Sequence, residues 1–220
     1  MTQMLRQARL LFAEVKQSQW LALVGSAIAL LATYGTFLSM VFSPDPEVAD
    51  RAIFTFQGIS AFLPPLGATM WAYLCVGSVF ERARDVLYAK NRHHLTRAVI
   101  RNVVLLLFLV LACSAITSLL VPQFAYNIMG ITLRVIASSV LCVGIIALAS
   151  YVFSVAYLGL AASLMFVLFS YGAHLGWFSG PPFWLMSGEG VDLNNVLTIA
   201  VIALALKAAL FVLETKRVRF

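Results

Sequence analysis

The sequence contains few charged residues. Only 11% of its 220 residues are Asp, Glu, Lys or Arg, whereas about a quarter of a soluble domain is charged. Hydrophobic residues make up 62% of the chain, and the mean hydropathy is +0.94. This composition excludes a cytosolic enzyme, a disordered tail and a disulfide-rich secreted domain. It favours a chain whose solvent is lipid.

Cysteines and motifs for catalysis are scarce as well. The three cysteines, Cys75, Cys113 and Cys142, all lie in apolar runs, which favours a packing role over a disulfide framework or a zinc site. The sequence contains no G-x-x-x-x-G-K-[ST] phosphate loop and no H-E-x-x-H zinc motif. We therefore expect the chain to have no enzymatic activity, to bind no metal and to bind no cofactor of its own.

The apolar runs contain no Asp or Glu, which argues against an ion-coupled pump. Two basic residues, Arg134 and Lys207, do fall within them. Each side chain either extends to the nearest lipid headgroups or contacts an anionic group of a substrate. The second alternative makes these two residues a possible substrate path.

Six apolar runs remain, and each is close to the length of about 20 residues that a membrane-spanning helix needs. They predict an all-α integral membrane protein that forms one transmembrane domain over residues 1–220. The predicted spans are residues 20–42, 59–80, 103–121, 131–153, 155–176 and 196–213.

The connecting segments carry signals of their own. Residues 1–19 place apolar side chains on one helical face and basic ones on the other, which predicts an amphipathic helix at the membrane surface. Residues 43–51 form a polar turn, and the apolar residues 53–56 that follow are expected at the interface. Pro64 and Pro65 are expected to bend the second span. Pro122 is expected to end the third.

The distribution of Lys and Arg predicts the orientation. With the N-terminus inside, twelve of the fifteen basic residues lie on the inner side, and only Arg51 lies in an outer connection. Because inner connections of membrane proteins are rich in Lys and Arg, we expect a multi-pass protein of the cell membrane with both termini in the cytoplasm. This topology explains the net charge of +6 without a nucleic-acid partner.

Two connections are unusual. Residues 81–102 carry six basic residues without Gly or Pro, which predicts a charged cytoplasmic helix between the second and third spans. Residues 177–195 are rich in aromatic residues, but Pro181 and Pro182 interrupt them. The segment is too short to cross the membrane twice and too apolar for water, so it predicts a re-entrant hairpin before the last span.

This arrangement resembles the ABC-2 type permease, which is the membrane subunit of one class of ATP-driven exporter. The resemblance implies that the segment from Glu81 to His94 is a coupling helix that docks on an ATPase, with an ordinary basic loop as the alternative. The docking residues would be Glu81, Arg82, Arg84, Asp85, Tyr88 and Arg92. The re-entrant hairpin would form an outer gate with Trp177, Phe178, Pro181, Pro182, Phe183 and Trp184.

The function implied by this resemblance is transport of an amphipathic or hydrophobic substrate, such as a peptide, a lantibiotic-like toxin or a drug. ATP and Mg would bind to a separate ABC ATPase subunit, and a second permease chain would complete the path as a homodimer or heterodimer. The alternatives are a substrate-binding membrane subunit of an uptake system, a haem-export subunit of similar architecture, and a membrane-embedded lipid-modifying enzyme.

Overall fold

The computed structural model describes residues 17–81, 94–153, 155–175 and 193–217, and it contains no strand in these ranges. The predicted all-α class is therefore confirmed. The elements are α2 (Gln17–Val41), α3 (Pro46–Asp50), α4 (Ala52–Glu81), α6 (His94–Leu120), the 3-10 turn η1 (Pro122–Phe124), α7 (Ala125–Phe153), α8 (Ala156–His174) and α10 (Leu193–Arg217).

Four of these helices are long and apolar enough to cross a membrane. Their apolar stretches are Leu23–Val41, Ala52–Val76, Val99–Leu120 and Pro122–Phe153. The fifth and sixth predicted spans correspond to shorter apolar helices, Ala156–Phe169 and Leu197–Leu213. A helical bundle embedded in a membrane is thus the class of protein that the fold defines, and the total of six spans stays a prediction.

The helices continue beyond several of the predicted spans, whose bounds stay predictions. α2 begins at Gln17 and therefore includes the last three residues of the predicted interfacial helix; residues 1–16 lie outside the described ranges. α6 begins nine residues before the predicted third span, and α7 begins six residues before the fourth. Polar and small residues at a span's end can still form helical backbone hydrogen bonds, so hydropathy marks the apolar core and not the helix end.

The segment 53–56 lies in a helix, and its predicted position at the membrane interface stays a prediction. These residues belong to α4, and Phe56 is only 1% exposed. Its ring stacks on that of Phe37 in α2, with centroids 4.6 Å apart, and this contact draws the start of α4 into the core. α4 also continues through Pro64 and Pro65. Each proline lacks the amide hydrogen of a helical bond, but the predicted bend stays a prediction.

The polar turn between the first two helices contains the short helix α3. Asp45 caps it, because its carboxylate accepts a hydrogen bond of 3.0 Å from the backbone amide of Glu47. Pro46 occupies the first turn, where its missing amide hydrogen leaves no bond unmade. At the other predicted breaker, Pro122 starts η1 directly after α6, so the expectation that it ends that helix is confirmed.

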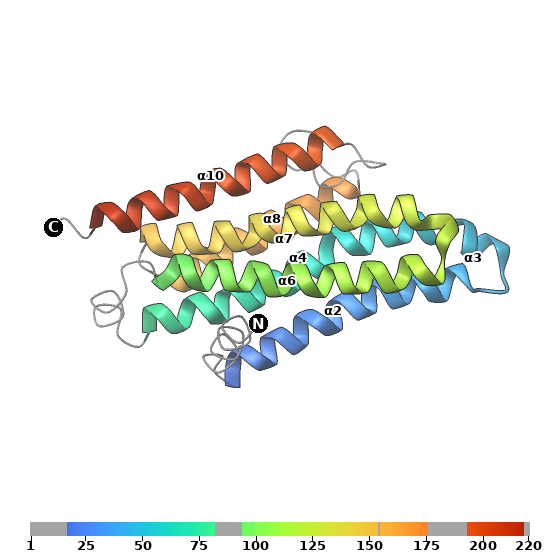
Figure 1. Cartoon of the computed structure of the whole chain (residues 1–220), viewed down its shortest axis with the longest axis horizontal. Helices are drawn as coiled ribbons and strands as arrows, with labels where there is room; N and C mark the ends of the chain where they lie inside the picture. Colours follow the sequence, from blue (N-terminus) through green and yellow to red (C-terminus); the bar gives the residue numbers. More distant parts are fainter. Residues whose placement is uncertain (1–16, 82–93, 154, 176–192, 218–220) are drawn as a thin grey trace, which may run out of the picture.

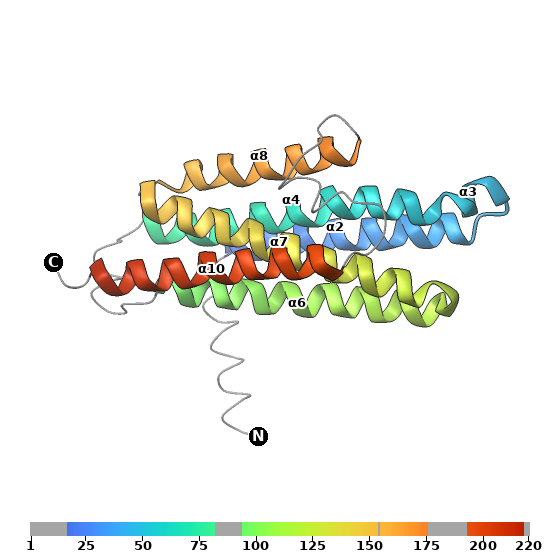
Figure 2. The same cartoon turned by 90° about the horizontal axis from the view of Figure 1, so that it is seen from above.

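Consecutive long helices run antiparallel and form an elongated bundle (Figure 1). One end holds α3 and η1, and we call it the α3 end. The other holds the C-terminal ends of α4, α7 and α10, and we call it the Arg217 end. Seen from above, α8 lies on one side of the α4–α7 pair, and α6 and α10 lie on the other side (Figure 2).

α4 and α7 form the centre of this bundle. α4 packs against α2, α7 and α8, whereas α7 packs against α4, α6, α8 and α10. α7 therefore has buried residues on nearly every side through its middle turns. α10 packs chiefly against α7 and touches α6 much less, which makes it a peripheral helix with one main neighbour.

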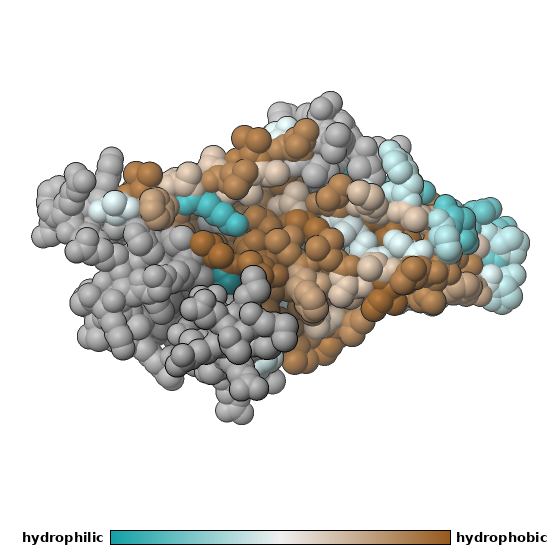
Figure 3. All heavy atoms as spheres, viewed as in Figure 1, coloured by the Kyte–Doolittle hydropathy of each residue, from teal (hydrophilic) through white to brown (hydrophobic). Residues whose placement is uncertain are grey.

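The sides of the bundle are apolar. Large hydrophobic side chains such as Phe108 and Leu119 are 71% and 81% exposed. Figure 3 shows the same hydrophobic character over the middle of one face, with hydrophilic residues gathered at the α3 end. An apolar belt of this size is unsuited to water and is what contact with lipid tails requires.

Candidate functional site

Arg134 lies in the third turn of α7 and is only 6% exposed. It shares a helical face with Ala137 and Leu141, three and seven residues further along. Those two residues pack against Ile199 and Ala203 of α10. Arg134 therefore lies toward the α3 end of the contact between α7 and α10. Burial to this degree argues against a side chain that extends freely to the headgroups.

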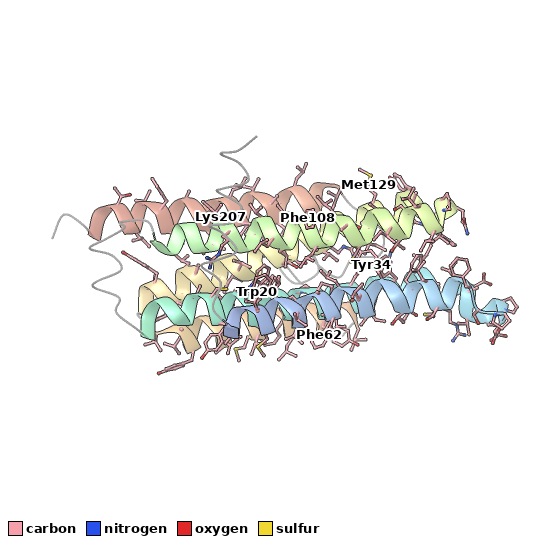
Figure 4. All side chains as sticks on the ribbon, turned by 60° about the horizontal axis from the view of Figure 1, so that its bottom comes forward. Trp20, Tyr34, Phe62, Phe108, Met129 and Lys207 are labelled. Carbon is pink, nitrogen blue, oxygen red and sulfur yellow. The ribbon has the colours of Figure 1, made fainter. Side chains whose placement is uncertain are left out.

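Lys207 lies on the same helix pair, but on the α10 side. Its helical neighbours Ala203 and Leu210 are each 2% exposed, and Lys207 is itself half-buried. It therefore lies at the edge of the face of α10 that packs into the bundle, next to exposed residues of the same helix. Figure 4 labels Lys207 at the edge of α10 nearest the other helices.

α7 and α10 run parallel, which fixes the separation of the two cations. A Cβ on Gly144 would lie 3.4 Å from Leu206 Cδ1, and the Tyr151 hydroxyl donates a hydrogen bond of 3.0 Å to the Leu213 carbonyl. Lys207 is thus near the level of Gly144, ten residues after Arg134. At 1.5 Å per residue this is about 15 Å along the helix axis.

An apolar cluster occupies the space between these two levels. We call this cluster, together with Arg134 and Lys207, the α7–α10 seam. Its buried members are Ala137, Leu141, Ile199 and Ala203, and Val140, Ile145, Phe166 and Leu206 pack against them. The seam therefore places a cation toward each end of a hydrophobic segment.

The chemistry available in the seam is binding of an anion. The apolar stretches of all six long helices contain no Asp or Glu, so no carboxylate shares the depth of either cation within them. The described residues contain no group of three metal-ligating side chains. An amphiphile with an acidic headgroup would match the seam, because its apolar part suits the cluster and its acid suits a cation.

Hydroxyl groups join the other helices of the bundle. The Tyr34 hydroxyl of α2 lies 3.0 Å from Thr132 Oγ1 of α7, which lies 2.8 Å from Ser114 Oγ of α6. Tyr34 is labelled in the interior of the bundle in Figure 4. A second pair, Thr69 Oγ1 and Ser163 Oγ, joins α4 to α8 at 2.9 Å. Such bonds hold membrane helices together where the hydrophobic effect between them is absent.

Most residues predicted for ATPase docking and gating lie outside the described ranges. Glu81 is the last residue of α4, and Arg82, Arg84, Asp85, Tyr88 and Arg92 fall in the gap that follows it. The six gate residues between Trp177 and Trp184 fall in the gap before α10. Their assignments stay predictions.

Sequence reasoning did identify the two cations, but it missed the helix pair that they share. It also missed the hydroxyl contacts, whose partners are 94 and 98 residues apart in the chain. The only signal was that the polar residues of the apolar runs are mainly Ser, Thr and Tyr. This signal indicates interhelical bonds in general but does not indicate the pairs.

Comparison of the chain with protein-family models, with curated proteins and with solved structures finds no match.

Proposed function

We propose that the chain is the permease subunit of an ATP-driven exporter of amphipathic substrates, working with a separate ATPase subunit. The observation that carries the proposal is the α7–α10 seam, where two cations within the predicted spans flank an apolar cluster. Ionisable residues inside a membrane are costly and commonly mark a transport path. The apolar cluster favours a substrate that is largely hydrophobic, and the cations favour one with an acidic group.

In this proposal the cargo's acidic group contacts Lys207 toward the predicted cytoplasmic end and Arg134 toward the predicted outer end. ATP-driven closure of the ATPase would move the segment after Glu81, and the helices would rock against one another. Because α10 depends chiefly on α7 for its contacts, separation of this pair is the motion that would open the seam. A second permease chain would complete the path.

The first experiment tests the partner. The full chain is purified from its native membranes under mild conditions, and the co-purifying proteins are examined for an ATPase. Charge reversal at Arg82 or Arg84 should weaken the association at least tenfold without reducing membrane insertion. Recovery of the chain alone from native membranes would contradict the proposal.

The second experiment tests the path. Inverted vesicles that contain the chain and its ATPase are supplied with ATP and with fluorescent acyl peptides that carry either a carboxylate or an amide terminus. We expect ATP-dependent uptake of the carboxylate form and at least a tenfold loss with Arg134→Gln. Arg134→Lys should retain part of the activity, and Arg51→Gln, which changes an exposed cation at the α3 end, should retain all of it.

A further inference from the structure

Lys207 differs from Arg134 in its surroundings. Arg134 is almost fully enclosed by the bundle, whereas Lys207 is half-buried, so part of its side chain meets the surroundings. α10 packs along α7 and makes far less contact with α6, although both helices lie on the same side of the α4–α7 pair (Figure 2). Lipid can therefore reach the exposed part of the Lys207 side chain beside α10.

Among the described residues, the apolar stretches of α10 and of the helices beside it contain no acid that could match the charge of Lys207. Leu197–Leu213 is the apolar stretch of α10, and the first acid beyond it is Glu214, two turns further along. The opposing stretches of α6 and α7 contain no Asp or Glu. Among the described residues no ion pair or hydrogen bond joins Lys207 to another side chain. An ammonium group at this depth requires an anion from outside these helices.

The depth of Lys207 suits a lipid headgroup at the Arg217 end. Lys207 lies six residues, or about 9 Å, from the end of the apolar stretch, and a lysine stem extends several ångströms further toward the interface. The exposed residues Leu204 and Phe211 flank it on the outer face of α10 and provide apolar contact for acyl chains.

We infer that Lys207 holds the phosphate of an anionic phospholipid from the leaflet at the Arg217 end, which the basic-residue distribution predicts to be cytoplasmic. The lipid lies against the exposed side of α10, with its headgroup on the ammonium and its chains on the apolar side chains of the helix. Basic sites between membrane helices on the cytoplasmic side are suited to anionic headgroups. The site requires neither an ATPase nor a cargo, so it does not rest on the proposed transport; in a transporter, the cargo's acid would replace the lipid phosphate on Lys207.

Native mass spectrometry of the purified full chain tests the inference. The chain in detergent is titrated with phosphatidylglycerol or with phosphatidylcholine of the same acyl chains. We expect the anionic lipid to be retained at least fivefold more strongly. Lys207→Gln should abolish this difference, and Lys207→Arg should preserve it.

Two controls make the result specific. Arg51→Gln removes one exposed positive charge from the α3 end and should leave the preference unchanged. Millimolar inorganic phosphate should not displace the lipid, since free phosphate lacks the acyl chains that contact α10. Equal retention of the two lipids by the unchanged protein, an unaltered preference in Lys207→Gln, or displacement by inorganic phosphate would each overturn the inference.

Each variant of Lys207 must be shown to fold before its lipid binding is compared. Removal of a half-buried charge from an apolar seam should not unfold the helix, and circular dichroism with size-exclusion chromatography verifies this for each variant. If Lys207→Gln does not fold, Lys207→Met supplies the same charge removal with an apolar side chain. A Lys207→Met variant that folds and keeps the preference would equally overturn the inference.

Discussion

α8 and α10 both pack against α7, but through contacts of different kinds. α8 approaches at Gly159, where an added Cβ would lie 2.6 Å from the Ile146 carbonyl oxygen and would also meet Ser150 Oγ. α8 is also held to α4 by the hydrogen bond between the hydroxyl groups of Thr69 and Ser163. α10 instead packs on an apolar cluster with a cation beyond each end, and its hydrogen bond from the Tyr151 hydroxyl to the Leu213 carbonyl lies near the Arg217 end.

This difference separates a fixed helix from a displaceable one. Backbone proximity and interhelical hydrogen bonds require one geometry, because a shift of an ångström breaks them. Contacts between Leu, Ile and Ala side chains persist over a range of positions, and lipid tails can replace them without a polar penalty. A route between helices would therefore open at α10 more easily than at α8.

The largest expected effect comes from filling the space at Gly159. Gly159→Ala places its Cβ against backbone and side-chain atoms of α7 and should lower the free energy of unfolding by about 3 kcal/mol, as severe overpacking does. Thermal unfolding of the purified chain in detergent measures this. The matched change Gly25→Ala, at a helical glycine with no atom within 4 Å of its added Cβ, should be neutral or slightly stabilising. Equal stability of the two variants would remove the distinction between α8 and α10.

Overpacking of the α7–α10 seam should cost less. Ala203 is 2% exposed and faces α7, and Ala203→Leu should lower the free energy of unfolding by about 1.5 kcal/mol. The cost is smaller than at Gly159 because α10 can move outward. Ala205→Leu, at an exposed position of the same helix, is the control and should change little. A loss for Ala203→Leu as large as that for Gly159→Ala would show that α10 is held as rigidly as α8.

The hydroxyl pair that fastens α8 should show a coupling energy. In a double-mutant cycle with Thr69→Val and Ser163→Ala, we expect about 1 kcal/mol of coupling, the scale of hydrogen bonds between membrane helices. Thr33 bonds only within its own helix, to the Ala29 carbonyl at 2.7 Å. A cycle of Thr33→Val with Ser163→Ala should therefore give no coupling, and an equal value in both cycles would assign the effect to burial.

The smallest effect is expected where a hydroxyl bonds α10. Tyr151→Phe removes the hydrogen bond to the Leu213 carbonyl and should cost about 0.5 kcal/mol. Because the bond lies near the Arg217 end, faster hydrogen exchange should appear in the last turns of α10 and not in α8. Tyr157→Phe, at a side chain that is 62% exposed, serves as the control. Unchanged exchange in Tyr151→Phe would mean that the seam alone holds this end of the helix.

Much of the fold could be predicted from the sequence. The apolar runs located every long helix, Pro122 located the end of α6, and the cluster of Asp and Pro in residues 43–51 located the turn around α3. These features depend on composition and on local backbone chemistry, and both can be assessed from a single sequence. The helix ends could not be predicted from the apolar runs, since a helix can continue for several turns beyond its apolar core.

The sequence by itself determined that this chain contains long apolar helices and that two cations, Arg134 and Lys207, lie within their apolar runs. It could not determine which faces of the helices meet, because a helix that is apolar on every side has no periodic pattern to orient it. Only the tertiary structure brought the two cations onto one helix pair and brought Thr69 to Ser163 across 94 residues. Which helices contact one another depends on close packing and on matched hydroxyl groups. Both are properties of pairs of helices and not of any one segment.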